Sequence, residues 1–209
     1  MTMLDYALDY AKRGWAVFPL VEKDKIPLTS HGFLDAVTDE TQIRSWWTKH
    51  PKANIGIATG QKSGGLVVID IDINEEKGKH GDEVFEEWQE ENGCYIDSLT
   101  AITGTGGKHY YFTSSEPFNS AAGYFEDIDV RADGGYVVAP GSIHPNGKEY
   151  FFDDEDEEIV CVQEDSDVEL FIPDGDREIC ATYYCHTSLR YAPSGDYRPT
   201  GPSDDDISI

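Results

Sequence analysis

The chain has 209 residues, of which 39% are apolar, and 41 acidic residues against 16 basic ones give it a net charge of -25. This apolar content excludes a disordered protein, and the length suits one domain with a small appendage. No stretch of 18 apolar residues occurs, so no transmembrane helix is expected. The charge argues against tight nonspecific binding to duplex DNA, which requires lysine and arginine against the phosphates.

The N-terminus lacks the basic start and apolar run of a signal peptide, so we expect a cytoplasmic protein. In that compartment cysteines are reduced, and no C-x-x-C pair is present, so we expect ordinary thiols and no zinc site. The four cysteines are Cys94, Cys161, Cys180 and Cys185.

The beginning of the chain predicts a helix followed by a strand. Apolar residues at helical spacing predict the helix over residues 3–13, which Gly14 ends. The apolar segment 15–20 predicts a strand that Pro19 stops.

The next segments alternate between helix and strand. A second helix is expected over residues 39–50, with Thr38 as its N-cap. Strands are expected over 54–60 and 64–73, and an acidic amphipathic helix over 81–92.

The second half of the chain predicts mostly strands. Residues 99–114 have the pattern of a strand, a glycine turn and a second strand. Residues 125–152 predict several short strands, with turns at 133–135 and 146–147. Consecutive strands joined by tight turns pair antiparallel, so the whole pattern predicts an α+β fold.

Composition divides the chain into three parts. We expect a folded domain over residues 1–152, an acidic extension packed on it over 153–192, and a linker-like or disordered tail over 193–209. Residues 153–176 contain no lysine or arginine, whereas residues 1–62 are nearly balanced in charge. One localised positive site is therefore compatible with the strong net charge.

The segment GGLVVIDIDI, residues 64–73, places two carboxylates inside an apolar run. On a strand, Asp70 and Asp72 project from the same face, where like charges destabilise each other. A hard divalent cation such as Mg²⁺ or Mn²⁺ between them would resolve this conflict. The alternative is a strand end, with both aspartates solvated in the following loop.

The segment TGTGGKHYYF, residues 103–112, combines glycines with basic side chains. Adjacent glycines allow backbone N–H groups to approach a phosphate, and a lysine or histidine adds positive charge. The segment lacks the Walker A pattern, so a simple hairpin turn is the alternative. The residues concerned are Gly104, Gly106, Gly107, Lys108 and His109.

A third acidic position, Asp129, lies in a short apolar alternation that Arg131 follows. It could be a surface residue on an edge strand. Three carboxylates on strands together with a Gly/Lys/His turn, however, are typical of a site for metal ions and phosphates. Two divalent ions bridged by carboxylates and phosphates are a common solution for nucleotidyl transfer.

These motifs, in this order, resemble the bifunctional DNA primase/polymerase N-terminal (prim-pol) domain of the archaeo-eukaryotic primase superfamily, of the phage, plasmid and mobile-element type. The resemblance covers about residues 3–152. It is carried by ALDYAKRGWAVFPL, KIPL, HGFLDAVTDETQIRSWW, NIGIATG, LVVIDIDI, TGTGGKHYYF and IDVRADGGYVVAPGSIHPNGKEY. It implies a primase-polymerase fold, with an RRM-like antiparallel-rich sheet core and an N-terminal α/β module.

The resemblance also implies an activity, which is template-directed nucleotidyl transfer from a (d)NTP to a 3′-hydroxyl with two Mg²⁺ or Mn²⁺ ions. Asp70, Asp72 and Asp129 would hold the metals, and His109 would contact the triphosphate. Gly106, Gly107 and Lys108 would support that contact, with Arg131 as a further phosphate ligand. Two other residues, Lys25 and Ser142, fall in recurrent family motifs without an assigned role.

The implied partners are a single-stranded DNA template with its primer, nucleoside triphosphates, and a helicase domain or helicase partner, but no membrane. The implied setting is DNA replication in a bacterial or phage-infected cell. One departure from the family pattern is Gly107, where a serine is common. Other functions left open are a metal-dependent nuclease or phosphodiesterase, a noncatalytic module that binds nucleotide or single-stranded DNA, and an acidic mimic that docks on a replication protein.

Overall fold

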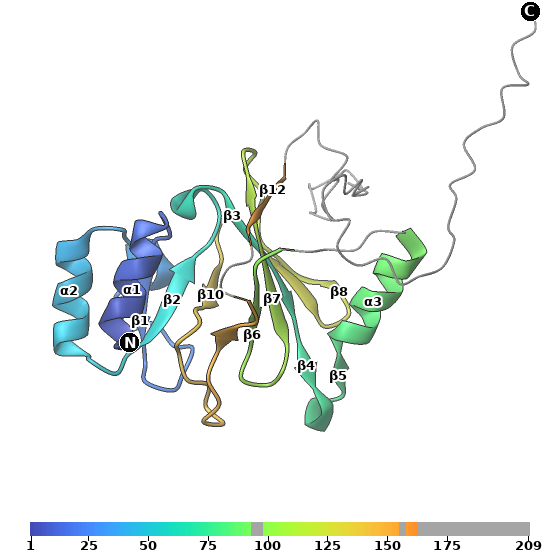
Figure 1. The fold of residues 1–209 in the computed structure, drawn as a ribbon, viewed down its shortest axis with the longest axis horizontal. Helices are drawn as coiled ribbons and strands as arrows, with labels where there is room; N and C mark the ends of the chain where they lie inside the picture. The colour runs from blue at the N-terminus through green and yellow to red at the C-terminus, as the bar shows by residue number, and fades with distance from the viewer. Residues whose placement is uncertain (93–97, 155–157, 163–209) are drawn as a thin grey trace, which may run out of the picture.

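The computed structural model describes residues 1–92, 98–154 and 158–162 (Figure 1). The expected tail over 193–209, most of the acidic extension, and Cys94, Cys180 and Cys185 lie outside these residues. No helix in the described part is long and apolar enough to cross a membrane.

Helix α1 (Met3–Lys12) begins with a capping box. The Thr2 hydroxyl accepts a hydrogen bond from the Asp5 amide, and the Asp5 carboxylate accepts one from the Thr2 amide. Both interactions satisfy amide groups that the first helical turn leaves unpaired. After the helix the chain turns at Gly14, whose φ of +85° favours glycine. The expected helix over residues 3–13 is confirmed to within one residue.

A small antiparallel sheet has the order β1–β2–β10 and consists of β1 (Val17–Leu20), β2 (Asn54–Ala58) and β10 (Tyr136–Val138). Pro19 does not stop β1, contrary to prediction, because it pairs opposite Ile55 and the strand continues to Leu20. Strand β1 is the edge of this sheet, where a residue without an N–H is tolerated.

Helix α2 (Glu40–Lys49) lies beside α1 at the small-sheet end of the molecule (Figure 1). Its N-cap is Asp39, and the prediction of Thr38 is wrong by one residue. The Asp39 carboxylate accepts a hydrogen bond of 2.8 Å from the Gln42 amide, the contact that defines an N-cap. Two 3₁₀ turns, η1 (Gly32–Asp35) and η2 (Gln61–Ser63), connect this part of the chain.

The large sheet has the order β11–β6–β7–β3–β9–β8, and every pairing along this path is antiparallel. A seventh strand, β12, pairs parallel to β7 and lies beyond the expected domain end at residue 152. The α+β class with mainly antiparallel sheets is confirmed. The strands are β3 (Leu66–Ile71), β6 (Thr100–Ile102), β7 (Lys108–Ser114), β8 (Ala121–Phe125), β9 (Ile128–Arg131), β11 (Phe151–Phe152) and β12 (Val160–Val162).

Between β3 and α3 (Gly81–Asn92) the chain forms a small hairpin of β4 (Ile73–Asn74), the 3₁₀ turn η3 (Glu75–Lys77) and β5 (Lys79–His80). The expected single strand over residues 64–73 is therefore wrong at its end, because β3 stops at Ile71. Helix α3 covers one face of the large sheet, where Phe85 packs in a cluster with Val67, Ile69 and Ile71 (Figure 1).

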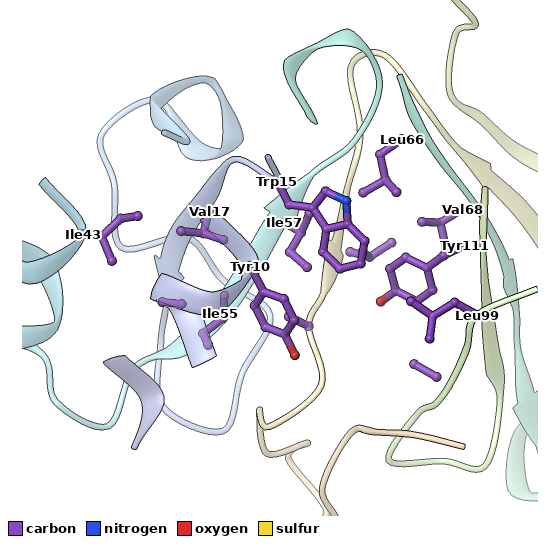
Figure 2. Close-up of a cluster of buried hydrophobic side chains, with 14 of the residues drawn as sticks. Tyr10, Trp15, Val17, Ile43, Ile55, Ile57, Leu66, Val68, Leu99 and Tyr111 are labelled. Carbon is purple, nitrogen blue, oxygen red and sulfur yellow. The ribbon is translucent and has the colours of Figure 1, made fainter. Parts of the chain in front are cut away.

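The other face of the large sheet packs against the small sheet and α1 (Figure 2). Trp15 lies in the centre, stacked on Tyr10 at 5.7 Å and on Tyr111 at 5.4 Å between ring centroids. Leu66 and Val68 of β3 face this cluster, whereas their neighbours on the strand face α3. The alternation fixes which side chains of β3, β7 and β9 can meet between the two sheets.

Ser142 ties the loop after β10 to the small sheet. Its side chain is fully buried, and its Oγ accepts a hydrogen bond of 3.0 Å from the Ile55 amide. Beside it, the Asn54 side chain bonds both the carbonyl and the amide of Ile143. Ser142 therefore has a structural role in this protein.

Replacing Ser142 with alanine should lower the free energy of unfolding by about 1–3 kcal/mol, because the buried Ile55 amide loses its acceptor. The measurement is a urea unfolding curve, with Thr41→Ala on the exposed surface of α2 as the control expected to change little. A Ser142→Ala protein as stable as the parent would show that this hydrogen bond does not hold the loop.

Candidate active site

Three predicted site residues form a row across the centre of the large sheet. In the strand register, Asp70 of β3 lies opposite His109 of β7 on one side and opposite Asp129 of β9 on the other. Directly opposed residues have Cβ atoms about 4.5–5.5 Å apart. All three side chains project from the face turned toward the small sheet, since their strand neighbours Ile69, Ile71, Ile128 and Val130 pack on the other face.

The Asp70 carboxylate lies between two basic side chains. Its Oδ1 lies 3.3 Å from Nε2 of His109, and its Oδ2 lies 3.7 Å from Nε of Arg131. Burial raises the pKa of Asp70, but the charges of His109, Arg131 and Lys25 and the His109 hydrogen bond outweigh burial, so the net shift is downward. The ionised form of Asp70 is therefore stabilised in the folded protein.

Asp129 is held from two directions. Its Oδ1 accepts a 2.6 Å hydrogen bond from the Gly123 amide of β8, and its Oδ2 lies 2.5 Å from Nη2 of Arg131. Since β9 lies between β3 and β8, Asp129 is not on an edge strand. Arg131 thus bridges the carboxylates of Asp70 and Asp129.

Asp72 occupies a different position from Asp70. It follows the end of β3, its amide donates to the Asp127 carbonyl at 2.9 Å, and its carboxylate contacts the ammonium of Lys79. Lys79 also lies 3.6 Å from Asp127. Both Asp70 and Asp72 are close enough to Tyr150 for their charges to raise its pKa, so the two carboxylates share one neighbourhood.

The glycine turn before β7 packs directly on the strand that carries the aspartates. A Cβ atom at Gly107 would lie 2.3 Å from the Ile71 carbonyl oxygen, so only glycine allows this approach. Gly106 has a φ of +96° in open space, and its amide closes the turn onto the Thr103 carbonyl at 3.0 Å. The turn therefore lies beside Asp72, but the Gly106 amide already donates its hydrogen bond within the turn.

Lys108 does not join the row. It precedes His109 on β7 and so points to the other face of the sheet, where it lines a cavity of about 300 Å³ together with Tyr110 and acidic residues of α3. The structure thus brings together Asp70, Asp129, His109 and Arg131, with Asp72 and Gly107 beside them, and leaves Lys108 apart.

A cavity of about 220 Å³ lies between the row and the small sheet. Asp70, His109 and Arg131 line it from the large sheet, and Lys25 and Tyr136 from the small-sheet side. Lys25, to which the sequence assigned no role, therefore adds a positive charge close to Asp70. The sequence analysis also missed Phe33, Tyr136 and Tyr150 as lining residues, because only the tertiary fold places them there.

The match with known families follows this geometry. A family model described as "Bifunctional DNA primase/polymerase, N-terminal" matches residues 7–164. The chain belongs to the prim-pol family. No curated protein matches the chain. The family match extends through β12, in agreement with the pairing of that strand to β7.

The prim-pol family resemblance implies divalent metal ions, and two carboxylates of the row fit such ions. Asp70 and Asp129 offer hard oxygen ligands from opposed positions on one face of the sheet. Among the residues that the structure describes, however, no three His, Cys, Asp or Glu side chains are gathered as a metal-binding group. The Asp72 carboxylate contacts Lys79 and is not gathered with the other two.

The lowered pKa of Asp70 predicts a pH-dependent contribution to stability. Because the folded-state pKa lies below the unfolded value near 4, this contribution is present at neutral pH and disappears as pH falls through the folded-state value. Asp70→Asn should therefore cost roughly 2 kcal/mol at pH 7, and the difference from the parent should shrink toward pH 3. Urea unfolding of both proteins across this range is the measurement, and a difference that does not change with pH would contradict the ion pairing.

Proposed function

We propose that this prim-pol domain is a DNA primase-polymerase that transfers a nucleotide from a (d)NTP to the 3′-hydroxyl of a primer strand. The observation that supports this most directly is that Asp70, His109 and Arg131 line one cavity, with Asp129 opposite Asp70 in the strand register and paired with Arg131. Membership of the bifunctional DNA primase/polymerase family supports the same reaction class.

The cavity has the charges that a triphosphate needs. Lys25, His109 and Arg131 line it, and a guanidinium forms two parallel hydrogen bonds with a phosphate. In the structure Arg131 is engaged with Asp70 and Asp129, so the incoming phosphates would compete with these carboxylates for it. We propose that His109 and Arg131 bind and orient the triphosphate, while Gly107 lets the turn before β7 pack closely on β3.

The carboxylates complete the proposed chemistry. Asp70 and Asp129, joined by Asp72, would hold Mg²⁺ or Mn²⁺, which supplies charge neutralisation of the phosphates and activation of the attacking hydroxyl. Asp70 is suited to this role because it remains ionised while it is largely buried. The in-line attack of the 3′-hydroxyl on the α-phosphate then depends on how firmly the row positions the triphosphate.

The proposal extends to the fold and the template. We infer a primase-type core in the large sheet, with α1, α2 and the small sheet as the N-terminal module. This module carries the least acidic part of the chain, and it exposes Ile26, Leu28 and Leu34. Apolar side chains beside Lys25 suit unpaired bases and a single phosphate backbone better than a duplex. We propose single-stranded DNA as the template, in replication of a phage, plasmid or mobile element with a helicase domain or partner.

The direct test is nucleotide addition on primed and unprimed single-stranded templates with Mg²⁺ or Mn²⁺. Asp70→Ala and Asp72→Ala should each lower the rate by at least about a hundredfold, because each removes a proposed ligand of the metal ions that would neutralise the phosphates. The matched control is Glu86→Ala, an exposed carboxylate on α3 across the sheet, which should keep the rate of the parent.

An Asp70→Ala protein that extends primers normally would contradict the assignment. If the parent adds no nucleotide but binds a nucleoside monophosphate better than a triphosphate, a nuclease or phosphodiesterase becomes the better explanation. Product on the unprimed template would add primase activity to polymerase activity.

A further inference from the structure

Tyr150 ends the segment that leads into β11, and its side chain is almost completely buried, with 1% of its surface exposed. It lines the cavity beside Asp70 and His109, and its ring centroid lies 6.2 Å from that of His109. Its hydroxyl is shielded from solvent and has no hydrogen-bond partner among the described residues. An unpaired buried hydroxyl destabilises the folded state, so its position requires an explanation.

Tyr111 provides the comparison. Its hydroxyl is also buried and has no hydrogen-bond partner in the described part of the chain. Its ring packs in the cluster around Trp15, and it does not line the cavity. Both tyrosines therefore bury an unpaired hydroxyl. They differ because only Tyr150 lines the proposed nucleotide site.

The surroundings of Tyr150 indicate what its hydroxyl can do. Burial raises its pKa, and the charges of Asp70 and Asp72 raise it further, so the hydroxyl keeps its proton. A neutral hydroxyl is a hydrogen-bond donor. His109, which lines the same wall, is the residue proposed to contact the triphosphate.

We propose that the Tyr150 hydroxyl donates a hydrogen bond to a phosphate oxygen of the nucleoside triphosphate bound in this cavity. The inference rests on the proposed function, since it assigns a further binding residue to the same site. Phosphate oxygens accept hydrogen bonds only, so they match a group that must donate. In the structure the Tyr150 hydroxyl is buried from water. A small side-chain adjustment, of the kind common on binding, would therefore let the ligand reach it.

The test compares Tyr150→Phe with Tyr111→Phe in the full chain. Both substitutions remove only a hydroxyl, and both should leave the protein at least as stable as the parent in urea. Calorimetric titration with ATP and dATP in the presence of Mn²⁺ should show roughly tenfold or greater weakening for Tyr150→Phe, equal for both nucleotides. Tyr111→Phe should bind both nucleotides like the parent.

Four outcomes overturn the inference. Unchanged triphosphate affinity in Tyr150→Phe would remove the contact while leaving the proposed function intact. A loss confined to ATP would assign the hydroxyl to the sugar, and an equal loss in Tyr111→Phe would assign the effect to packing. A parent protein that neither binds nor incorporates a triphosphate would overturn the proposed function, and this inference with it.

Discussion

The site depends on the ion pairing of one largely buried carboxylate, Asp70, with His109 and Arg131. Strands β7, β3 and β9 each supply one of these side chains on the same face of the sheet. The register between neighbouring strands brings the three side chains together. The charges of His109 and Arg131 make the ionised Asp70 tolerable in a poorly solvated position. The same pairing leaves a carboxylate, a guanidinium and an imidazole at the wall of one cavity.

This arrangement accounts for how a chain of net charge -25 can offer a site for a polyanion. Positive side chains from separate elements meet at the cavity, with Lys25 from the small-sheet side and Arg131 from β9. The acids of α3 lie across the large sheet from this cavity. The acidic cluster of α3 is therefore kept away from the face on which Lys25 and Arg131 meet.

Much of the site follows from the sequence, because alternation in a strand needs only local information. Asp70, His109 and Asp129 were singled out by their places in apolar strand patterns and Arg131 by the family resemblance, and the structure brings the four together. The same alternation places Lys108 and its neighbour His109 on opposite faces of the sheet. The sequence prediction treated both as part of one phosphate-binding turn and so missed this separation. Strand register, the break of β3 after Ile71 and the contact of Lys79 with Asp72 depend on tertiary pairing, which one sequence does not reveal.

The helix and strand boundaries show the same limit. The capping box of α1 is local and the helix was placed well, whereas the N-cap of α2 depended on a choice between two adjacent capping residues. Pro19 is accommodated because β1 is an edge strand, which is a property of the sheet and not of the segment. Tyr150 lies about forty residues from His109 in the sequence, and only the packing of the two sheets brings them into one cavity wall.

On the proposed function, Asp70 and Asp129 together hold the metal ions of a nucleotide site. A titration with Mn²⁺ followed by electron paramagnetic resonance, with and without a nucleoside triphosphate, tests it most directly on the parent and Asp129→Asn. We expect tight Mn²⁺ binding in the parent, strengthened by the triphosphate, and at least about a tenfold loss of affinity in the variant. Equal Mn²⁺ binding by both proteins would mean that ions associate with the acidic surface alone, and the assignment of the row would be contradicted.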